Sequence, residues 1–240
     1  MGDRRGASPD SSSLNSRAAL VALGEEVASC RKCPRLVDWR EEVAGRPSPR
    51  FADQHYWGRP IAGFGDADAR LLVVGLAPAA HGGNRTGRVF TGDRSGDFLF
   101  GSLHRTGFAN QATSTHVDDG LALSGVYITA AVRCAPPANR PSPEERDRCA
   151  PYLVREIELL PAVRAIVVLG AFAYEATWRA LRSSGASLPR PRPRFAHGAE
   201  AQAGYKTVLC SFHPSQQNTF TGRLTPEMLD GVFLRASELS

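Results

Sequence analysis

The chain has 240 residues, of which 42% are hydrophobic and 22% charged, a length and composition typical of one globular domain. No apolar run is long enough to cross a membrane, and no signal-peptide core lies near the start. We therefore expect a cytoplasmic protein with no membrane partner. The net charge of +5 favours an anionic partner such as nucleic acid.

The hydrophobic pattern predicts helices alternating with strands after a polar, serine-rich tail at residues 1–15, which we expect to be disordered. Residues 16–29 have a helical pattern, whereas residues 35–69 look irregular and are expected to wrap the domain without entering the sheet. Strands are predicted at 70–75, 126–132, 165–170 and 207–212. Further helices are predicted at 94–105, from 143, at 171–181 and from 226.

This alternation predicts an α/β fold in which helices cover both faces of a parallel sheet, a three-layer αβα arrangement within residues 16–240. Two helix starts carry clear signals. Ser142, Pro143 and Glu145 make a capping box, and Asp93 is placed to cap the helix that begins at residue 94. The proline- and arginine-rich stretch at 188–195 fits either a phosphate contact or a solvated connector, and we favour the connector.

The segment from Leu71 to Asp93 is the stretch around which we expect the site to form. A buried strand runs into a long turn of small residues, and such turns let a ligand approach the backbone closely. The turn matches neither standard nucleotide-binding fingerprint. Its candidate ligand contacts are Gly75, Ala77, His81, Asn84, Arg85, Arg88, Phe90 and Asp93. His213 follows another strand in the same way.

Four of the five cysteines lie outside strand interiors, at Cys30, Cys33, Cys134 and Cys149. A disulfide framework is not expected in a chain of this kind, so we interpret them as metal ligands. One close pair with two distant partners fits an iron–sulfur cluster at least as well as zinc, and the spacing leaves both open. Cys210 lies within a predicted strand and is expected in the core.

Three stretches, Gly75–Asp93, Val126–Pro141 and Ser211–Thr225, together with these four cysteines, resemble the family 5 (type B) uracil-DNA glycosylases. The resemblance implies a four-stranded parallel sheet and a [4Fe–4S] cluster on the four cysteines. It also implies excision of uracil and other deaminated bases, such as hypoxanthine, from DNA.

The residue types suit that chemistry, because a glycosylase must extrude a base, hold it and stabilise a breaking C1′–N bond. Phe90 could stack on the base, His213 could donate to the base carbonyl, and Asp93 could orient water. The resemblance also places Asn139 near the active site. Core packing, helix capping and a structural histidine are the plain alternatives for Phe90, Asp93 and His213.

Two departures from better-known uracil glycosylases affect the expected activity. Those enzymes carry a polar or acidic residue soon after the first strand to activate water, where this chain has Leu76, Ala77, Ala79 and Ala80. Ala130 stands where related cluster-containing enzymes use an asparagine to read uracil. A pocket without that amide should discriminate less, so we expect a broad substrate range. The only two lysines, Lys32 and Lys206, lie outside the predicted site loops, so we expect a monofunctional enzyme that leaves an abasic site.

Contacts to the duplex are expected from both loops. Phe220 or Gln216 could fill the gap left by the base, while Asn84, Arg85, Arg88 and Arg223 could contact phosphates. We expect a monomer. The alternatives are a non-catalytic iron–sulfur or zinc protein that binds nucleic acid, and a hydrolase of free nucleosides or nucleotides.

Overall fold

The computed structural model describes residues 11–240, so the first ten residues of the predicted tail lie outside the described part of the chain. The α-helices are α1 (Ser11–Ala28), α2 (Pro34–Gly45), α3 (Gly83–Thr86), α4 (Arg94–Arg105), α5 (Pro143–Leu159), α6 (Ala171–Ser183), α7 (Gln216–Phe220) and α8 (Pro226–Leu239). The strands are β1 (Phe64–Gly65), β2 (Leu71–Gly75), β3 (Val126–Ala130), β4 (Ala165–Leu169), β5 (Glu200–Ala203) and β6 (Lys206–Ser211). Two short 3₁₀ helices, η1 and η2, span Pro49–Phe51 and Pro137–Asn139.

One sheet organises the chain, with strand order β1-β3-β2-β4-β6-β5. The four central strands are parallel, as predicted, and Val73 of β2 pairs with Ile128 of β3 on one side and Val167 of β4 on the other. The two edge strands, β1 and β5, run antiparallel to their neighbours. Because every residue of β2, β3 and β4 is buried, these strands form the centre of the core.

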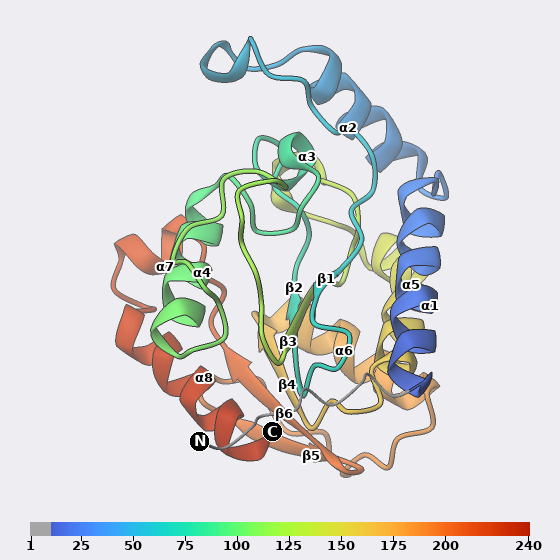
Figure 1. Cartoon of the computed structure of the whole chain (residues 1–240), viewed down its shortest axis with the longest axis vertical. Coiled ribbons are helices and arrows are strands. Elements are labelled where there is room, and N and C mark those ends of the chain that lie inside the picture. The colour runs from blue at the N-terminus through green and yellow to red at the C-terminus, as the bar shows by residue number, and fades with distance from the viewer. Residues whose placement is uncertain (1–10) are drawn as a thin grey trace, which may run out of the picture.

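Helices cover both faces of the sheet and give the predicted three layers (Figure 1). Helices α4 and α8 pack together on one face, where α8 contacts β4 and β6. Helices α5 and α6 pack together on the other face, with α1 outside α5. Helix α3 lies beyond the carboxyl end of β2, the edge at which open parallel sheets bind ligands (Figure 1).

The helix signals in the sequence are confirmed. The hydroxyl of Ser142 accepts a hydrogen bond from the Glu145 amide at 3.2 Å, and the Glu145 carboxylate accepts one from the Ser142 amide at 2.7 Å. Asp93 caps α4 by accepting a hydrogen bond from the Gly96 amide at 3.0 Å. Cys210 is buried in the core, as expected.

The prediction that residues 35–69 are irregular and stay outside the sheet is wrong. Pro34 begins α2, whose buried face includes Leu36, Val37 and Val43, and Phe64 pairs with Ile128 as part of β1. Proline is favoured at the first position of a helix, but Pro34 follows the Cys30–Cys33 pair directly, and that stretch was interpreted only as a metal-binding motif. The sheet also gains β5, and α1 begins at Ser11, so residues 11–15 are helical instead of disordered.

Within residues 11–240, no helix combines the length and the apolar character needed to span a bilayer.

Candidate active site

A cavity of about 620 Å³ lies at the carboxyl ends of the parallel strands. Its walls come from the segments that follow β2, β3, β4 and β6, and they include Phe90, Asp93 and His213. Phe90 and Asp93 were predicted from the loop after β2, whereas His213 was predicted from the end of β6, far away in the sequence. The fold brings them to one cavity, which is the arrangement that a reaction on a single bound base requires.

Phe90 is held in an unusual backbone conformation, with a φ of 54° that few non-glycine residues adopt. Its ring lies over Gly75, and a Cβ atom on Gly75 would be 2.5 Å from the Phe90 Cζ atom. The Phe90 and His213 ring centroids are 6.2 Å apart, with 34° between the ring planes. Gly75 therefore leaves the space that the Phe90 ring occupies.

Asp93 uses one carboxylate oxygen to cap α4 and holds the other against Gly82, where a Cβ atom would come within 2.1 Å of Oδ2. Burial raises the pKa of Asp93 above its ordinary value, although the amides of Gly96 and Ser95 oppose the shift by donating hydrogen bonds. The carboxylate is therefore a stronger base than an exposed aspartate. Capping and a chemical role are compatible because they use different oxygens.

His213 follows β6 and lies in the same cavity, close to Gly170, where a Cβ atom would be 3.2 Å from the His213 Cβ atom. Burial lowers the pKa of His213 to about 4, so the imidazole is neutral at physiological pH. No hydrogen bond among the described residues engages its ring nitrogens. A neutral ring with an available N–H can donate to a carbonyl or to a developing anion without adding charge.

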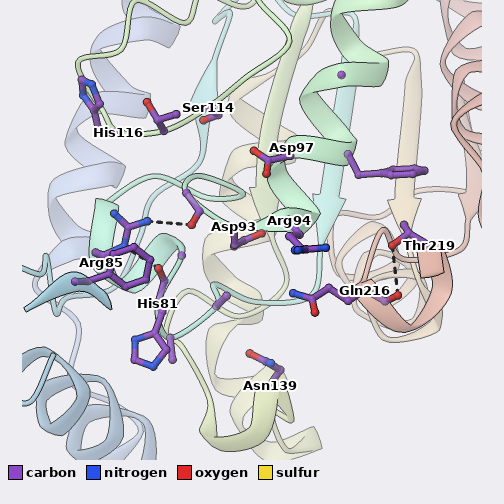
Figure 2. Close-up of a pocket in the computed structure, with 18 of the residues that line it drawn as sticks. His81, Arg85, Asp93, Arg94, Asp97, Ser114, His116, Asn139, Gln216 and Thr219 are labelled. Carbon is purple, nitrogen blue, oxygen red and sulfur yellow. Dashed lines mark hydrogen bonds between the residues drawn. The ribbon is translucent and has the colours of Figure 1, made fainter. Parts of the chain in front are cut away.

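A larger groove of about 1310 Å³ adjoins this cavity, and the two share Asp93, Arg94, Asn139 and Gln216. Figure 2 shows Asp93 and Arg94 at the start of α4, facing Gln216 of α7, with Asn139 at another side of the opening. Phe220 lies at the rim of the groove, 67% exposed, and the Arg94 guanidinium is 5.1 Å from the centre of its ring. A groove with an exposed aromatic beside a pocket suits a duplex with one base extruded.

The four predicted ligand cysteines line one small cavity, at the junction of α1, α2, α5 and the segment after β3. Burial raises the pKa of Cys134 to about 11 and that of Cys149 to about 12. Among residues 11–240, no three histidine, cysteine or carboxylate side chains converge closely enough to hold a single metal ion.

Two buried arginines line the same cavity. Arg40 donates a hydrogen bond to the Cys134 sulfur at 3.0 Å, and Arg133 is paired with Glu156. The Nε atoms of both arginines are buried without a hydrogen-bond partner within the described structure. Unpartnered buried donors beside four thiols fit an anionic group held by the cysteines.

Comparison with known proteins identifies the family of this chain. A family model described as the uracil DNA glycosylase superfamily matches residues 62–235. The chain belongs to the uracil-DNA glycosylase superfamily. It is 54% identical over 92% of its length to a type-5 uracil-DNA glycosylase of Mycobacterium tuberculosis, covering 82% of that protein. It is 55% identical to that of Mycobacterium leprae (92% and 96% covered) and 50% identical to that of Thermus thermophilus (91% and 97%).

Within this superfamily fold, two of the predicted phosphate contacts are wrong. Arg88 is buried, and its guanidinium donates to Ser114 at 2.8 Å and to Asp119 at 2.7 Å. Asn84 is also buried, with its amide bonded to the Arg40 carbonyl at 3.1 Å. Both side chains stabilise the loop by these hydrogen bonds. They are not free to contact DNA, because they are buried against residues that are distant in the sequence.

Three other predicted contacts, His81, Arg85 and Ala77, line one of the two cavities. Arg85 and His81 line the large groove, although Arg85 already donates to Gln54, His81 and Gly92. Ala77 lines the smaller cavity. Ala130 is buried and does not line either cavity, but it pairs with Gly75, so its Cβ atom is on the sheet face that Phe90 covers.

Sequence reasoning missed several wall residues of the smaller cavity, including Arg94, Gly170 and Phe172. Gly170 directly follows β4 and has a φ of 97°, which favours glycine. A glycine at the end of a predicted parallel strand was the signal that could have identified the loop after β4.

Proposed function

We propose that this protein removes uracil from DNA by hydrolysing the bond between the base and the deoxyribose. The observation that carries the proposal is the meeting of Phe90, Asp93 and His213 in one cavity beside a large groove. The type-5 and superfamily relationships support it. The named relatives cover nearly the whole chain, so the inference concerns the entire domain.

Base binding begins with extrusion of the target nucleotide from the duplex into the smaller cavity. The Phe90 ring offers one face for stacking, because its other side covers Gly75. His213, neutral and close to Phe90, donates its N–H to a carbonyl oxygen of the base. That hydrogen bond strengthens as the base takes up negative charge, so it stabilises the transition state more than the bound substrate.

Asp93 acts on the sugar side of the same bond. As the C1′–N bond breaks, its electron pair stays with the base and positive charge develops on the sugar. The Asp93 carboxylate offsets that charge, orients a water molecule toward C1′ and accepts a proton from it. The base leaves as an anion and takes up a proton from solvent, so the products are the free base and an abasic site. The raised pKa of Asp93 suits it to accept that proton.

We also propose that hypoxanthine and other deaminated bases are substrates. The cavity walls near the base are largely apolar, with Leu76, Ala77, Leu169 and Phe172 among them. Ala130 supplies no amide on the face that Phe90 covers. Stacking and one donated hydrogen bond tolerate more than one base, whereas fixed amide partners would reject most of them.

The reaction is proposed to stop at the abasic site. Lys206 is buried, and its ammonium group donates to the Val163 carbonyl at 3.1 Å near the amino end of the sheet. Lys32 lies beside the cysteine cavity, 5.0 Å from the centre of the Tyr152 ring. Neither lysine lines the catalytic cavity or the groove, so no amine is placed for a Schiff base. Trapping of a covalent protein–DNA adduct with borohydride would refute the proposal that no Schiff base forms.

A [4Fe–4S] cluster on Cys30, Cys33, Cys134 and Cys149 is proposed as a structural cofactor. Support comes from their shared cavity and from the unpartnered Arg40 and Arg133 donors beside it. A bound cluster would fasten α2 and the start of α5 to the end of β3. Anaerobically purified protein should contain about four iron atoms and four sulfides per chain, with visible absorption that Cys134→Ala removes. Stoichiometric zinc in their place would contradict the proposal.

The activity is tested with duplexes that carry one uracil, one hypoxanthine or no lesion, treated with alkali after incubation. Alkali-revealed breaks at the lesion alone are the expected result. A parallel assay supplies free deoxyuridine instead of DNA. Hydrolysis of deoxyuridine without any cleavage of the duplexes would favour a nucleoside hydrolase. Binding without breaks, in protein with its full iron content, would favour a non-catalytic DNA-binding protein.

A further inference from the structure

The proline- and arginine-rich segment at residues 188–195 does not run free across the surface. The Tyr174 hydroxyl of α6 donates a hydrogen bond to the Pro193 carbonyl at 2.7 Å. The Phe195 ring centroid is 5.9 Å from that of Tyr174 and 6.4 Å from that of Phe212. The segment is therefore fastened at its second half to α6 and to the end of β6.

These anchors place the segment beside the catalytic cavity. Helix α6 begins at Ala171, which lines that cavity, and Phe212 directly precedes His213. Just beyond Phe195, the Phe212 amide donates to the His197 ring at 3.2 Å. Arg223, from the loop after α7, lies with its guanidinium 4.5 Å from the centre of the Phe212 ring. Arg223 thus lies against Phe212, and Arg194 directly precedes Phe195 in the chain.

The arginines of this surface differ in whether they are already paired. Arg192 forms an ion pair with Glu175, which also pairs with Arg179. Arg190, Arg194 and Arg223 are exposed, and no ion pair or hydrogen bond between described residues engages their guanidinium groups. Unpaired cations on an anchored backbone bind an anion with a small entropy cost, because the chain is already ordered.

We propose that Arg190, Arg194 and Arg223, called here the arginine edge, bind the phosphate backbone of the DNA strand next to the extruded nucleotide. The arginine edge would extend the DNA contact beyond the wedge residues of α7. This inference rests on the proposed DNA glycosylase function.

The test compares two double variants that lose the same charge. Arg190→Gln with Arg194→Gln removes two cations of the arginine edge. Arg70→Gln with Arg182→Gln removes two exposed arginines elsewhere on the protein. Arg70 directly precedes β2 and Arg182 lies in the last turn of α6, so both are near the amino ends of the parallel strands, away from the cavity. Binding of each protein to a duplex with one abasic site is measured by fluorescence anisotropy between 0.05 and 0.3 M salt. Wild-type excision of uracil from the same oligonucleotide sequence is measured in parallel.

The arginine-edge variant should bind about five- to thirtyfold more weakly at 0.15 M salt, and its slope of log affinity against log salt should be smaller by about two. The control variant should match the wild type, and Arg190→Lys with Arg194→Lys should recover most of the slope. Equal affinities and slopes in both glutamine variants would overturn the arginine edge. Failure of the wild type to excise uracil would instead overturn the proposed function.

Discussion

The ring of Phe90 occupies the space that a side chain on Gly75 would need, with 2.5 Å between the Phe90 Cζ atom and a Cβ atom built at that position. Gly75 ends β2, and Phe90 lies fifteen residues later, at the wall of the cavity. The missing side chain at the end of the central strand therefore sets the position of the surface on which the base is proposed to stack.

Gly75→Ala should displace the Phe90 ring and weaken base binding. The backbone at Gly75 does not have a positive φ, so alanine introduces a clash with the ring and no backbone strain. Single-turnover excision of uracil should slow by about tenfold or more, because misplacing a binding surface by about 1 Å costs that much or more. Gly231→Ala, which meets no atom within 4 Å, is the matched control. An unchanged rate in Gly75→Ala would contradict the stacking role.

The pH dependence of excision should have one acid limb, set by Asp93. His213, with a pKa of about 4, stays neutral across the assay range, whereas Asp93 loses its basic form as the pH falls through its raised pKa. His213→Gln should lower the single-turnover rate about 10²- to 10³-fold and leave the limb in place. If the acid limb of the pH–rate profile disappeared in His213→Gln and remained in Asp93→Asn, the titrating group would be His213 and not Asp93.

Burial of the Asp93 carboxylate should cost stability at neutral pH. A folded-state pKa above the unfolded value means that the folded protein is favoured at low pH, and this advantage is lost as the pH rises through the raised pKa. Asp93→Asn keeps a capping side chain without the charge, so it should unfold at a higher urea concentration than wild type at pH 7. Asp93→Ala loses the cap as well and should be about 1 kcal/mol less stable than Asp93→Asn.

Ala130→Asn should narrow the range of bases excised. The new amide would project from β3 toward the face that Phe90 covers and could pair with uracil in a way that hypoxanthine does not allow. The ratio of uracil to hypoxanthine excision rates should rise, and Ala130→Ser should leave it near the wild-type value. A folded Ala130→Asn protein with the wild-type ratio would contradict the proposed cause of the broad range.

Asn84 links the loop that carries Phe90 and Asp93 to the cysteine cavity. Its amide donates to the Arg40 carbonyl at 3.1 Å, while the Arg40 guanidinium contacts Cys134 at 3.0 Å. Asn84→Ala should lower the free energy of unfolding by about 1–3 kcal/mol, since it leaves a buried carbonyl unpaired. Excision should slow while the iron content stays near wild type, and parallel loss of iron and activity would mean that the residue acts only through the cysteines.

Local signals predicted the parts of this fold that depend on neighbouring residues. The four apolar runs form the four parallel strands, and Ser142 and Asp93 cap the helices that follow them. Because parallel strands end at one edge, the sequence alone is enough to place residues such as Phe90 and His213 together. The edge strand β1, two residues long, could not be predicted, because it exists only through its pairing with β3.

The sequence also could not show which polar side chains are free to contact DNA and which are bonded inside the protein. Arg88 and Asn84 lie in a glycine-rich loop and look like phosphate contacts, but Asp119 and Arg40 bind them inside the protein. Arg190 and Arg194 lie in a stretch with the composition of a plain connector, yet Tyr174 and Phe212 anchor it beside the site. In both cases the deciding contacts come from residues far away in the chain.

The central claim is that Asp93 serves the chemistry as well as capping α4. The most direct measurement is single-turnover excision from a duplex with one uracil, comparing wild type with Asp93→Asn, whose cap is retained. The account predicts a folded Asp93→Asn protein that binds the duplex normally and excises uracil at least about 100-fold more slowly. Equal excision rates in the two proteins would return Asp93 to the role of a helix cap and contradict the mechanism.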